Sequence, residues 1–244
     1  MRYKIVLEYD GTNFDGWQKQ PNGKGVQNIV ENALAAFNPE APKTIVAGRT
    51  DAGVHALGQV ISIDIAREIT PNKLCDALNA HLRFHPIIAI SAEAVDENFS
   101  ARFSAKKRYY RYVILNRPAP PALLANRVWH LPHKLNLAVM QKAAMDFIGQ
   151  HDFTSFRSVA CQAKNPVRQM LDFTITPRED QIWLECSAPA FLHHQVRNMV
   201  GTLVEIGRGQ RPADDIPRIL AARDRAVAGV TAPAGGLYFV RVDY

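Results

Sequence analysis

Two kinds of apolar spacing alternate along this chain of 244 residues. Residues 3–9, 59–65 and 106–115 place apolar side chains at every second position, which predicts strands with one buried face. Residues 26–37 and 70–82 place them three and four positions apart, which predicts amphipathic helices. Because a helical pattern does not suit a strand and a strand pattern does not suit a helix, the alternation predicts a fold that mixes the two throughout.

The rest of the chain continues the same order. We expect further strands at 43–47, 87–95 and 237–242, a hairpin of 167–176 with 181–187, and helices at 136–148, 191–206 and 214–222. Both halves then run strand, helix, strand, strand, helix and strand. The pattern predicts an α+β protein with a mainly antiparallel sheet and helices on one side. We place the boundary near residues 98–106, which gives lobes of 1–104 and 105–244 without a low-complexity linker.

Composition narrows the class of protein. Hydrophobic residues make up 47% of the chain and charged residues 21%, which favours a globular protein. No apolar run reaches the roughly 18 residues of a membrane span, and the alternating first eight residues do not resemble a signal peptide. Three widely separated cysteines, Cys75, Cys161 and Cys186, indicate reduced thiols in the cytoplasm. The net charge of +6 is compatible with a phosphate-rich partner but does not by itself indicate one.

The densest polar cluster is the loop of residues 48–53, which contains Arg49 and Asp51 between two glycines. Glycines allow a tight turn and a close approach of the backbone to a ligand. One interpretation is a structural turn in which Asp51 accepts hydrogen bonds from nearby backbone N–H groups. The other is a carboxylate that acts as a nucleophile or a general base. Burial would raise the pKa of such a carboxylate, and a nearby arginine would lower it. The loop alone leaves both interpretations open.

Two distant segments bear on this choice. Arg197 lies within the mainly apolar segment 191–201, where it either extends to solvent or meets a buried acid. The segment 106–112 interleaves cations with Tyr109, Tyr110 and Tyr112, and alternation places Tyr110 on one face with Tyr112. Such rings can stack on an extruded base, although a tyrosine-rich strand with a solvated basic face has the same pattern.

No metal or nucleotide cofactor has support in the sequence. His193 and His194 are adjacent, so on a helix they would point to different sides and make a poor metal pair. The chain has no HExxH, CxxC or phosphate-binding loop motif.

Several motifs in order then resemble a known family. They are the segments at 9–11, 14–18, 48–56 (GRTDAGVHA), 100–110, 151–153, 191–201 and 232–238. Over nearly its full length the chain closely resembles bacterial tRNA pseudouridine synthase A. The resemblance implies two similar lobes that form a largely antiparallel central sheet flanked by helices, with the active-site cleft between the lobes.

The resemblance also implies an activity. The family isomerises uridine to pseudouridine at positions 38, 39 and 40 in the anticodon stem-loop of tRNA, as a cytoplasmic homodimer without a cofactor. The reaction consumes no water and transfers no electrons, but the base must leave the stack. The carboxylate can act at C1′ of the ribose or at C6 of the uracil, and the sequence leaves both open.

The resemblance also implies a role for each residue that matches a functional position of the family. Asp51 matches the catalytic aspartate, and Arg49 an arginine that holds the flipped nucleotide. Tyr110 matches the tyrosine that stacks on the base and is placed to take part in proton removal from C5. Arg197 matches the arginine paired with the aspartate, and Leu237 the apolar residue beneath the base.

One departure from the family pattern is Ser100, which stands where the family commonly has histidine, and residues 82–86 also differ from the usual pattern. We expect both departures to affect tRNA contacts or packing more than activity. An alternative function is a non-catalytic tRNA-binding or folding protein. A hydrolase that uses Asp51 is a third, but it would need a second carboxylate, and no other motif offers one.

Overall fold

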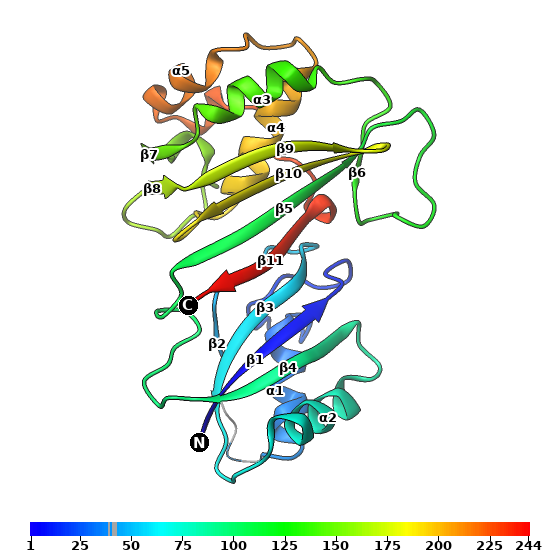
Figure 1. Cartoon of the computed structure of the whole chain (residues 1–244), viewed down its shortest axis with the longest axis vertical. Coiled ribbons are helices and arrows are strands. Elements are labelled where there is room, and N and C mark those ends of the chain that lie inside the picture. Colours follow the sequence, from blue (N-terminus) through cyan, green and yellow to red (C-terminus); the bar gives the residue numbers. More distant parts are fainter. Residues whose placement is uncertain (39, 41–42) are drawn as a thin grey trace. The chain divides into compact units, whose positions relative to one another are not determined.

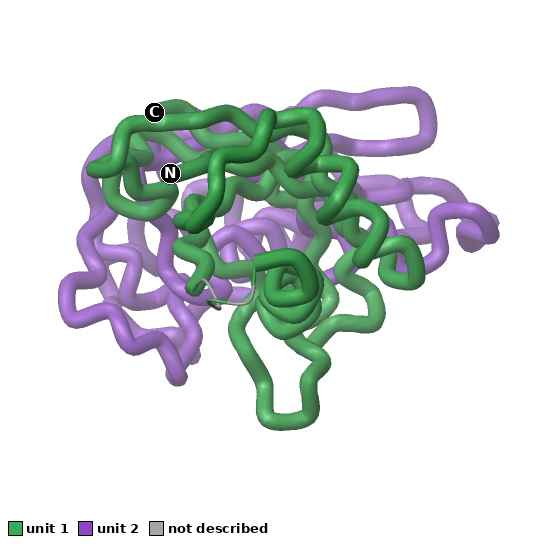
Figure 2. Tube along the Cα trace, turned by 90° about the horizontal axis from the view of Figure 1, so that it is seen from below, with its two compact units in different colours: residues 1–108, 238–244 green, residues 109–237 purple. Residues whose placement is uncertain are grey.

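The computed structural model describes residues 1–38, 40 and 43–244. They form two compact units (Figure 2): residues 1–108 with 238–244, and residues 109–237. The expected lobes, 1–104 and 105–244, stay a prediction. Within the described residues, no helix is long and apolar enough to cross a membrane.

The first unit is a sheet with two helices (Figure 1). The sheet order is β4–β1–β3–β11, and β2 pairs with β3. All these pairings are antiparallel except that of β11 with β3, which is parallel. The elements are β1 (Arg2–Tyr9), α1 (Val26–Ala35), β2 (Ile45–Val46), β3 (His55–Asp64), α2 (Pro71–Leu82), β4 (Ile87–Val95) and β11 (Leu237–Asp243), of which Tyr238 onward belongs to this unit.

The core of the first unit follows from the strand alternation. In β1 every second side chain is fully or almost fully buried, namely Tyr3, Ile5, Leu7 and Tyr9. The helices α1 and α2 pack against each other, and α2 packs against β4. Each helix buries the side chains of its apolar stripe. Full burial of such a side chain contributes about 1.5–3 kcal/mol, so the two periodicities seen in the sequence define this core.

The second unit combines a sheet in the order β5–β10–β9 with a separate β7–β8 pair. The strand β6 pairs with β5, and α3 packs against both α4 and β9. Its elements are β5 (Lys107–Leu115), of which Tyr109 onward belongs to this unit, β6 (Trp129–His130), α3 (Leu137–Met145), β7 (Gly149–Asp152), η1 (Thr154–Phe156), β8 (Val167–Met170), β9 (Asp172–Arg178), β10 (Gln181–Ala188), α4 (Gln195–Gly207), α5 (Asp215–Ala222), η2 (Arg225–Val227) and η3 (Ala234–Gly236).

An aromatic cluster fills the core of the second unit. The ring of Phe147 lies 5.0 Å from that of Phe156 and 5.7 Å from that of Phe173, measured between centroids. Phe153 completes the group at 6.3 Å from Phe147. These distances are in the range at which aromatic rings attract each other beyond simple burial. The cluster joins the loop after α3, η1 and β9.

Most expected elements are present, and the α+β prediction is confirmed. Several expected ends differ by one to three residues, and three larger differences have a structural cause. The expected strand 167–176 is two strands that part at Leu171, because β8 pairs with β7 while β9 pairs with β10. The strand β3 begins at His55 rather than residue 59, because its first residues pair with β1 and β11.

The third difference is the start of α4, which we expected near residue 191. His194 has φ 63°, a left-handed conformation that ends any helix entering from the N-terminal side. The turn before it is closed by the side chain of Gln195, whose Oε1 accepts the N–H of Leu192 at 2.8 Å. The helix therefore begins at Gln195.

Candidate active site

The loop that carries Asp51 joins β2 to β3 and is held by backbone hydrogen bonds to the loop after β1. The N–H of Trp17 donates to the carbonyl of Thr50 at 3.0 Å, and the N–H of Gly53 donates to the carbonyl of Phe14 at 3.2 Å. Within the loop, the N–H of Val54 donates to the Asp51 carbonyl at 3.1 Å. Asp51 thus lies between Thr50 and Gly53, whose backbone groups are both hydrogen-bonded to the loop after β1.

Two glycines make this close approach of the loops feasible. Gly16 has φ +91°, and a Cβ on it would lie 2.8 Å from the carbonyl oxygen of Thr50. A Cβ on Gly11 would lie 2.0 Å from the carbonyl oxygen of Val54. Larger residues at these positions would push the two loops apart, because no Cβ approaches a backbone oxygen so closely.

A buried hydrogen-bond chain supports the residue before Asp51. The hydroxyl groups of Tyr9 and Thr50 lie 2.8 Å apart, and Gln59 Nε2 donates to Tyr9 Oη at 3.3 Å and to the Gly48 carbonyl at 2.7 Å. All three side chains are buried. Burial raises the pKa of Tyr9 to about 12, so its hydroxyl stays protonated at neutral pH.

His55 fixes the other end of the loop. Its side chain is 2% exposed and its ring stacks on Tyr238, with 4.8 Å between centroids. The N–H of Gly11 donates to Nδ1 at 3.0 Å. Asp10 Oδ1, 3.1 Å from the same nitrogen, accepts the N–H of Thr12 at 3.0 Å. His55 therefore acts here as a hydrogen-bond acceptor that holds the loop after β1.

Arg108 connects the Asp51 loop to the segment around Ser100. The Nε of this buried arginine donates to the Ala47 carbonyl at 2.8 Å, and Nη2 donates to the Arg102 carbonyl at 2.7 Å. The Oγ of Ser100 accepts the N–H of Phe103 at 3.3 Å, which closes the turn there. Ser100 thus has a local structural contact in the position where the family commonly has histidine.

Arg49 lies in the same loop as Asp51, and its side chain is exposed. The sequence predicted that these two residues share one loop, and they do. An exposed arginine next to the carboxylate is available to a phosphate or a ribose of a nucleic acid.

In the second unit, Tyr110 lies on the buried face of β5, as the alternation predicted. Its ring meets that of Phe191 edge to face, with 4.9 Å between centroids. Tyr112 follows on the same face and donates its hydroxyl to the Pro233 carbonyl at 2.7 Å. Burial raises the pKa of Tyr112. Both rings are thereby held in defined orientations.

Arg197 belongs to a face of α4 that packs on the segment of residues 228–232. Its Nε donates to the Ala232 carbonyl at 2.8 Å, and the N–H of Ala232 donates to the Arg197 carbonyl at 3.1 Å. One helical turn further, Gly201 lies so close to this segment that a Cβ would be 1.7 Å from the Val230 carbonyl oxygen. The side chain of Arg197 is therefore oriented by the segment, not simply extended to solvent.

Asn198 strengthens the same contact and was missed in the sequence. It is fully buried, donates from Nδ2 to the Phe156 carbonyl at 2.8 Å, and accepts at Oδ1 from Thr231 Oγ1 at 2.7 Å. An asparagine in an apolar helical stretch was the signal that could have identified it, because buried amides need partners. Leu237 lies further along the chain, at the start of β11, and is 5% exposed.

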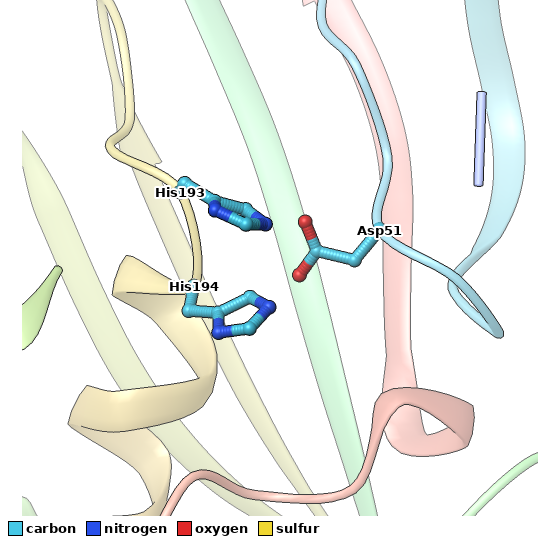
Figure 3. A group of neighbouring side chains, drawn as sticks. All are labelled: Asp51, His193 and His194. Carbon is cyan, nitrogen blue, oxygen red and sulfur yellow. The ribbon is translucent and has the colours of Figure 1, made fainter. Parts of the chain in front are cut away.

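His193 and His194 precede α4, and Figure 3 shows them on the turn that leads into this helix, with Asp51 on the loop before β3. We expected the two imidazoles to point to different sides of a helix, and this was wrong. Their ring centroids are 4.1 Å apart. The left-handed backbone of His194 turns the chain between them, so helical geometry does not apply.

The expected site residues thus divide between the units. Arg49 and Asp51 lie in the first, and Tyr110, Arg197 and Leu237 lie in the second. Their joint action in one site stays a prediction. The sequence missed Gln59 as a support of the loop, since a glutamine within a strand gives no signal of its own.

Comparison with known proteins identifies the class of enzyme to which this chain belongs. A family model described as tRNA pseudouridine synthase matches residues 5–104 and 143–244. The chain belongs to this family.

Individual relatives match this chain over its whole length. A protein of Rhodospirillum centenum named tRNA pseudouridine synthase A is 51% identical over 243 residues, which cover 100% of this chain and 99% of the relative. Proteins of the same name from Rhodopseudomonas palustris and Wolbachia pipientis are 50% and 48% identical, again over 100% of this chain and 99% and 100% of the relatives. Among solved structures, a Cbf5-Nop10-Gar1 complex aligns with 97% of this chain and 48% of the matched chain, at 10% identity and a TM-score of 0.41.

Proposed function

We propose that this protein is an isomerase that converts uridine to pseudouridine at positions 38, 39 and 40 in the anticodon stem-loop of tRNA. The observation that carries the proposal is the GRTDAGVHA loop, in which Asp51 is held between hydrogen bonds to two residues of the neighbouring loop. Membership of the tRNA pseudouridine synthase family supports the same reaction.

The chemistry needs little more than a positioned carboxylate. The N1–C1′ bond breaks, the uracil turns, the C5–C1′ bond forms, and the proton lost from C5 is balanced by one gained at N1. In the proposal Asp51 is the nucleophile. Attack at C1′ and attack at C6 lead to the same product and differ in the atom that the carboxylate bonds. No redox step or hydrolysis occurs, so we propose that no cofactor takes part.

Four other residues have proposed roles. Arg49 holds the flipped nucleotide, and its exposure supports a contact with RNA. Tyr110 stacks on the base and takes part in proton removal, and its fixed contact with Phe191 supports a positioned ring. Arg197 serves as the partner of the nucleophile, supported by its orienting bond to Ala232. Leu237 packs beneath the base, which its apolar side chain at the start of β11 supports.

Three properties of the whole protein complete the proposal. We propose that it acts in the cytoplasm, as a homodimer, on a tRNA partner. The net charge of +6 supports a polyanionic substrate, because neutralising phosphates releases counterions.

Release of tritium from tRNA that carries 5-tritiated uridine tests the function, because only bond formation at C5 expels that hydrogen. We expect release by the wild type, none by Asp51→Ala, and retained tRNA binding by the variant. Asp76→Ala removes an exposed carboxylate of the same unit from α2 and should release tritium at the wild-type rate.

Other outcomes would identify other functions. Binding without any tritium release by the wild type would favour a non-catalytic tRNA-binding or folding protein. Cleaved RNA would favour a hydrolase. Equal release by the wild type and Asp51→Ala would remove Asp51 from the chemistry.

A further inference from the structure

A hollow of about 540 Å³ with a mixed polar and apolar lining lies in the first unit, outside the Asp51 loop. Its walls come from the loop after β1, from α1, from the end of α2 and from His85 in the turn between α2 and β4. Apolar side chains, Phe14, Ile29 and Ala33, contribute part of the lining. Polar side chains supply most of the rest: Asn13, Asn22, Lys24, Asn32, His81 and His85. We call it the Lys24 pocket.

We propose that the Lys24 pocket binds an unpaired nucleotide of the RNA substrate together with an adjoining phosphate. This inference rests on the proposed function for the identity of the RNA. It adds a second contact site, separate from the residues assigned to the reaction.

The chemistry of the lining fits a nucleotide. Asparagine amides offer donors and acceptors together, which suits the edge of a base, while the lysine supplies a charge for a phosphate. Apolar side chains beside them can contact the base plane. No carboxylate belongs to the described lining, and the nearby Asp15 carboxylate accepts a hydrogen bond from Asn22. Asn13, Lys24, Asn32 and His85 are exposed and reach solvent.

The pocket walls are held in place before any ligand binds. The carbonyl of Lys24 accepts the N–H of Asp15 at 3.1 Å, and its own N–H donates to Asn22 Oδ1 at 3.0 Å. The Nδ2 of Asn22 donates to Asp15 Oδ2 at 2.7 Å. On the helical side, His81 stacks on Phe37 with 6.0 Å between ring centroids. A preformed site loses less entropy on binding than a mobile one.

The pocket is also joined directly to the Asp51 loop. Phe14, which lines the pocket, accepts the N–H of Gly53 at 3.2 Å. The carbonyl of Pro86, next to His85, accepts the N–H of Asp10 at 3.0 Å. The loop of residues 10–25 therefore contacts the Asp51 loop through Phe14 and forms part of the pocket. A nucleotide bound in the Lys24 pocket would therefore help to fix the position of the RNA relative to Asp51.

Paired substitutions on exposed helix and loop positions test the inference. Lys24→Ala removes a pocket cation, and Lys73→Ala removes an exposed cation of α2 outside the pocket. Asn32→Asp adds a negative charge inside the pocket, and Asn72→Asp adds the same charge at the start of α2. All four side chains are exposed, so the variants should fold, and thermal unfolding checks this.

Binding of a fluorescent anticodon-arm hairpin, titrated at several salt concentrations, provides the first readout. We expect Lys24→Ala to raise Kd about tenfold and to reduce the slope of log Kd against log salt by about one, as for one lost phosphate contact. Asn32→Asp should raise Kd at least as much, and the two control variants should stay near the wild type. The rate of tritium release at saturating tRNA should stay at the wild-type value in the two control variants, Lys73→Ala and Asn72→Asp, which lie outside the pocket.

Each alternative outcome has a defined meaning. Equal weakening by Lys24→Ala and Lys73→Ala would overturn the proposal, since only overall charge would then matter. The proposal would also be overturned if Lys24→Ala weakened the binding of UMP or inorganic phosphate but left the affinity for the hairpin unchanged. The pocket would then be a site for small anions. A wild type that releases no tritium would refute the proposed function, while a Kd that depends on Lys24 and not on Lys73 would still support an RNA contact here.

Discussion

Gly16 lies directly against the backbone of Asp51: a Cβ on Gly16 would be 3.1 Å from the carbonyl carbon of Asp51. The two residues belong to different loops that hydrogen bonds join on both sides of this contact. The position of the proposed nucleophile thus depends on the absence of a side chain on a residue far from it in sequence.

Replacing Gly16 with alanine should therefore destabilise the first unit and disturb Asp51. The positive φ costs about 1–2 kcal/mol for an alanine, and the crowding against Thr50 and Asp51 adds to this. Gly23→Ala is a matched control, since Gly23 has φ +76° in the same loop but nothing lies within 4 Å of its Cβ position. Urea unfolding should show a larger loss for Gly16→Ala, and tritium release at saturating tRNA should fall only in that variant. Equal losses of stability would show that crowding does not matter.

Gly201→Ala should be strongly destabilising although alanine is the better helix former. A Cβ there would be 1.7 Å from the Val230 carbonyl oxygen, so α4 and the segment of residues 228–232 would have to separate. We expect a loss of about 3 kcal/mol or more, in the range of severe overpacking. Gly207→Ala, at the end of the same helix, would be crowded by the flexible side chain of Met140 and would meet Leu135 Cβ at an ordinary 3.6 Å, so it should cost much less. Chemical denaturation of both variants measures the difference, and similar values would contradict the packing argument.

Tyr9 should contribute to loss of stability at alkaline pH. Burial raises its pKa to about 12, above the unfolded value near 10. Its contribution is therefore fully present below about pH 10 and is lost as pH rises through about 12. Tyr9→Phe should reduce the alkaline loss of unfolding free energy by on the order of 2–3 kcal/mol. Denaturant unfolding at a series of pH values tests this, and an unchanged alkaline loss in the variant would count against it.

Tyr110→Phe should separate stacking from proton transfer. The ring and its contact with Phe191 remain, so binding and stability should change little. If the hydroxyl takes part in proton removal from C5, kcat should fall by about 10²–10⁴. Tyr109→Phe, on the opposite face of β5, is the matched control and should keep its turnover. Unchanged kcat in Tyr110→Phe would remove the hydroxyl from the reaction.

The sequence by itself determined the kinds of element and the candidate residues. Apolar periodicity is a local property, so β1, α1, α2, β4 and β5 lie where it predicted them. The Asp51 loop was also visible locally, because glycines and charged residues between two strands indicate a turn that can carry a reactive side chain. Only the ordered motifs of the family, spread along the chain, favoured a catalytic carboxylate over a structural turn.

Tertiary structure decided what local spacing does not contain. Leu171 ends one strand because residues before and after it pair with different partners, and α4 begins late because His194 is left-handed. The packing of Gly16 on Asp51 and of Gly201 on Val230 likewise requires backbones that meet across long stretches of chain. Periodicity records which face of an element is buried but not what it is buried against, and that pairing fixes the geometry of each loop.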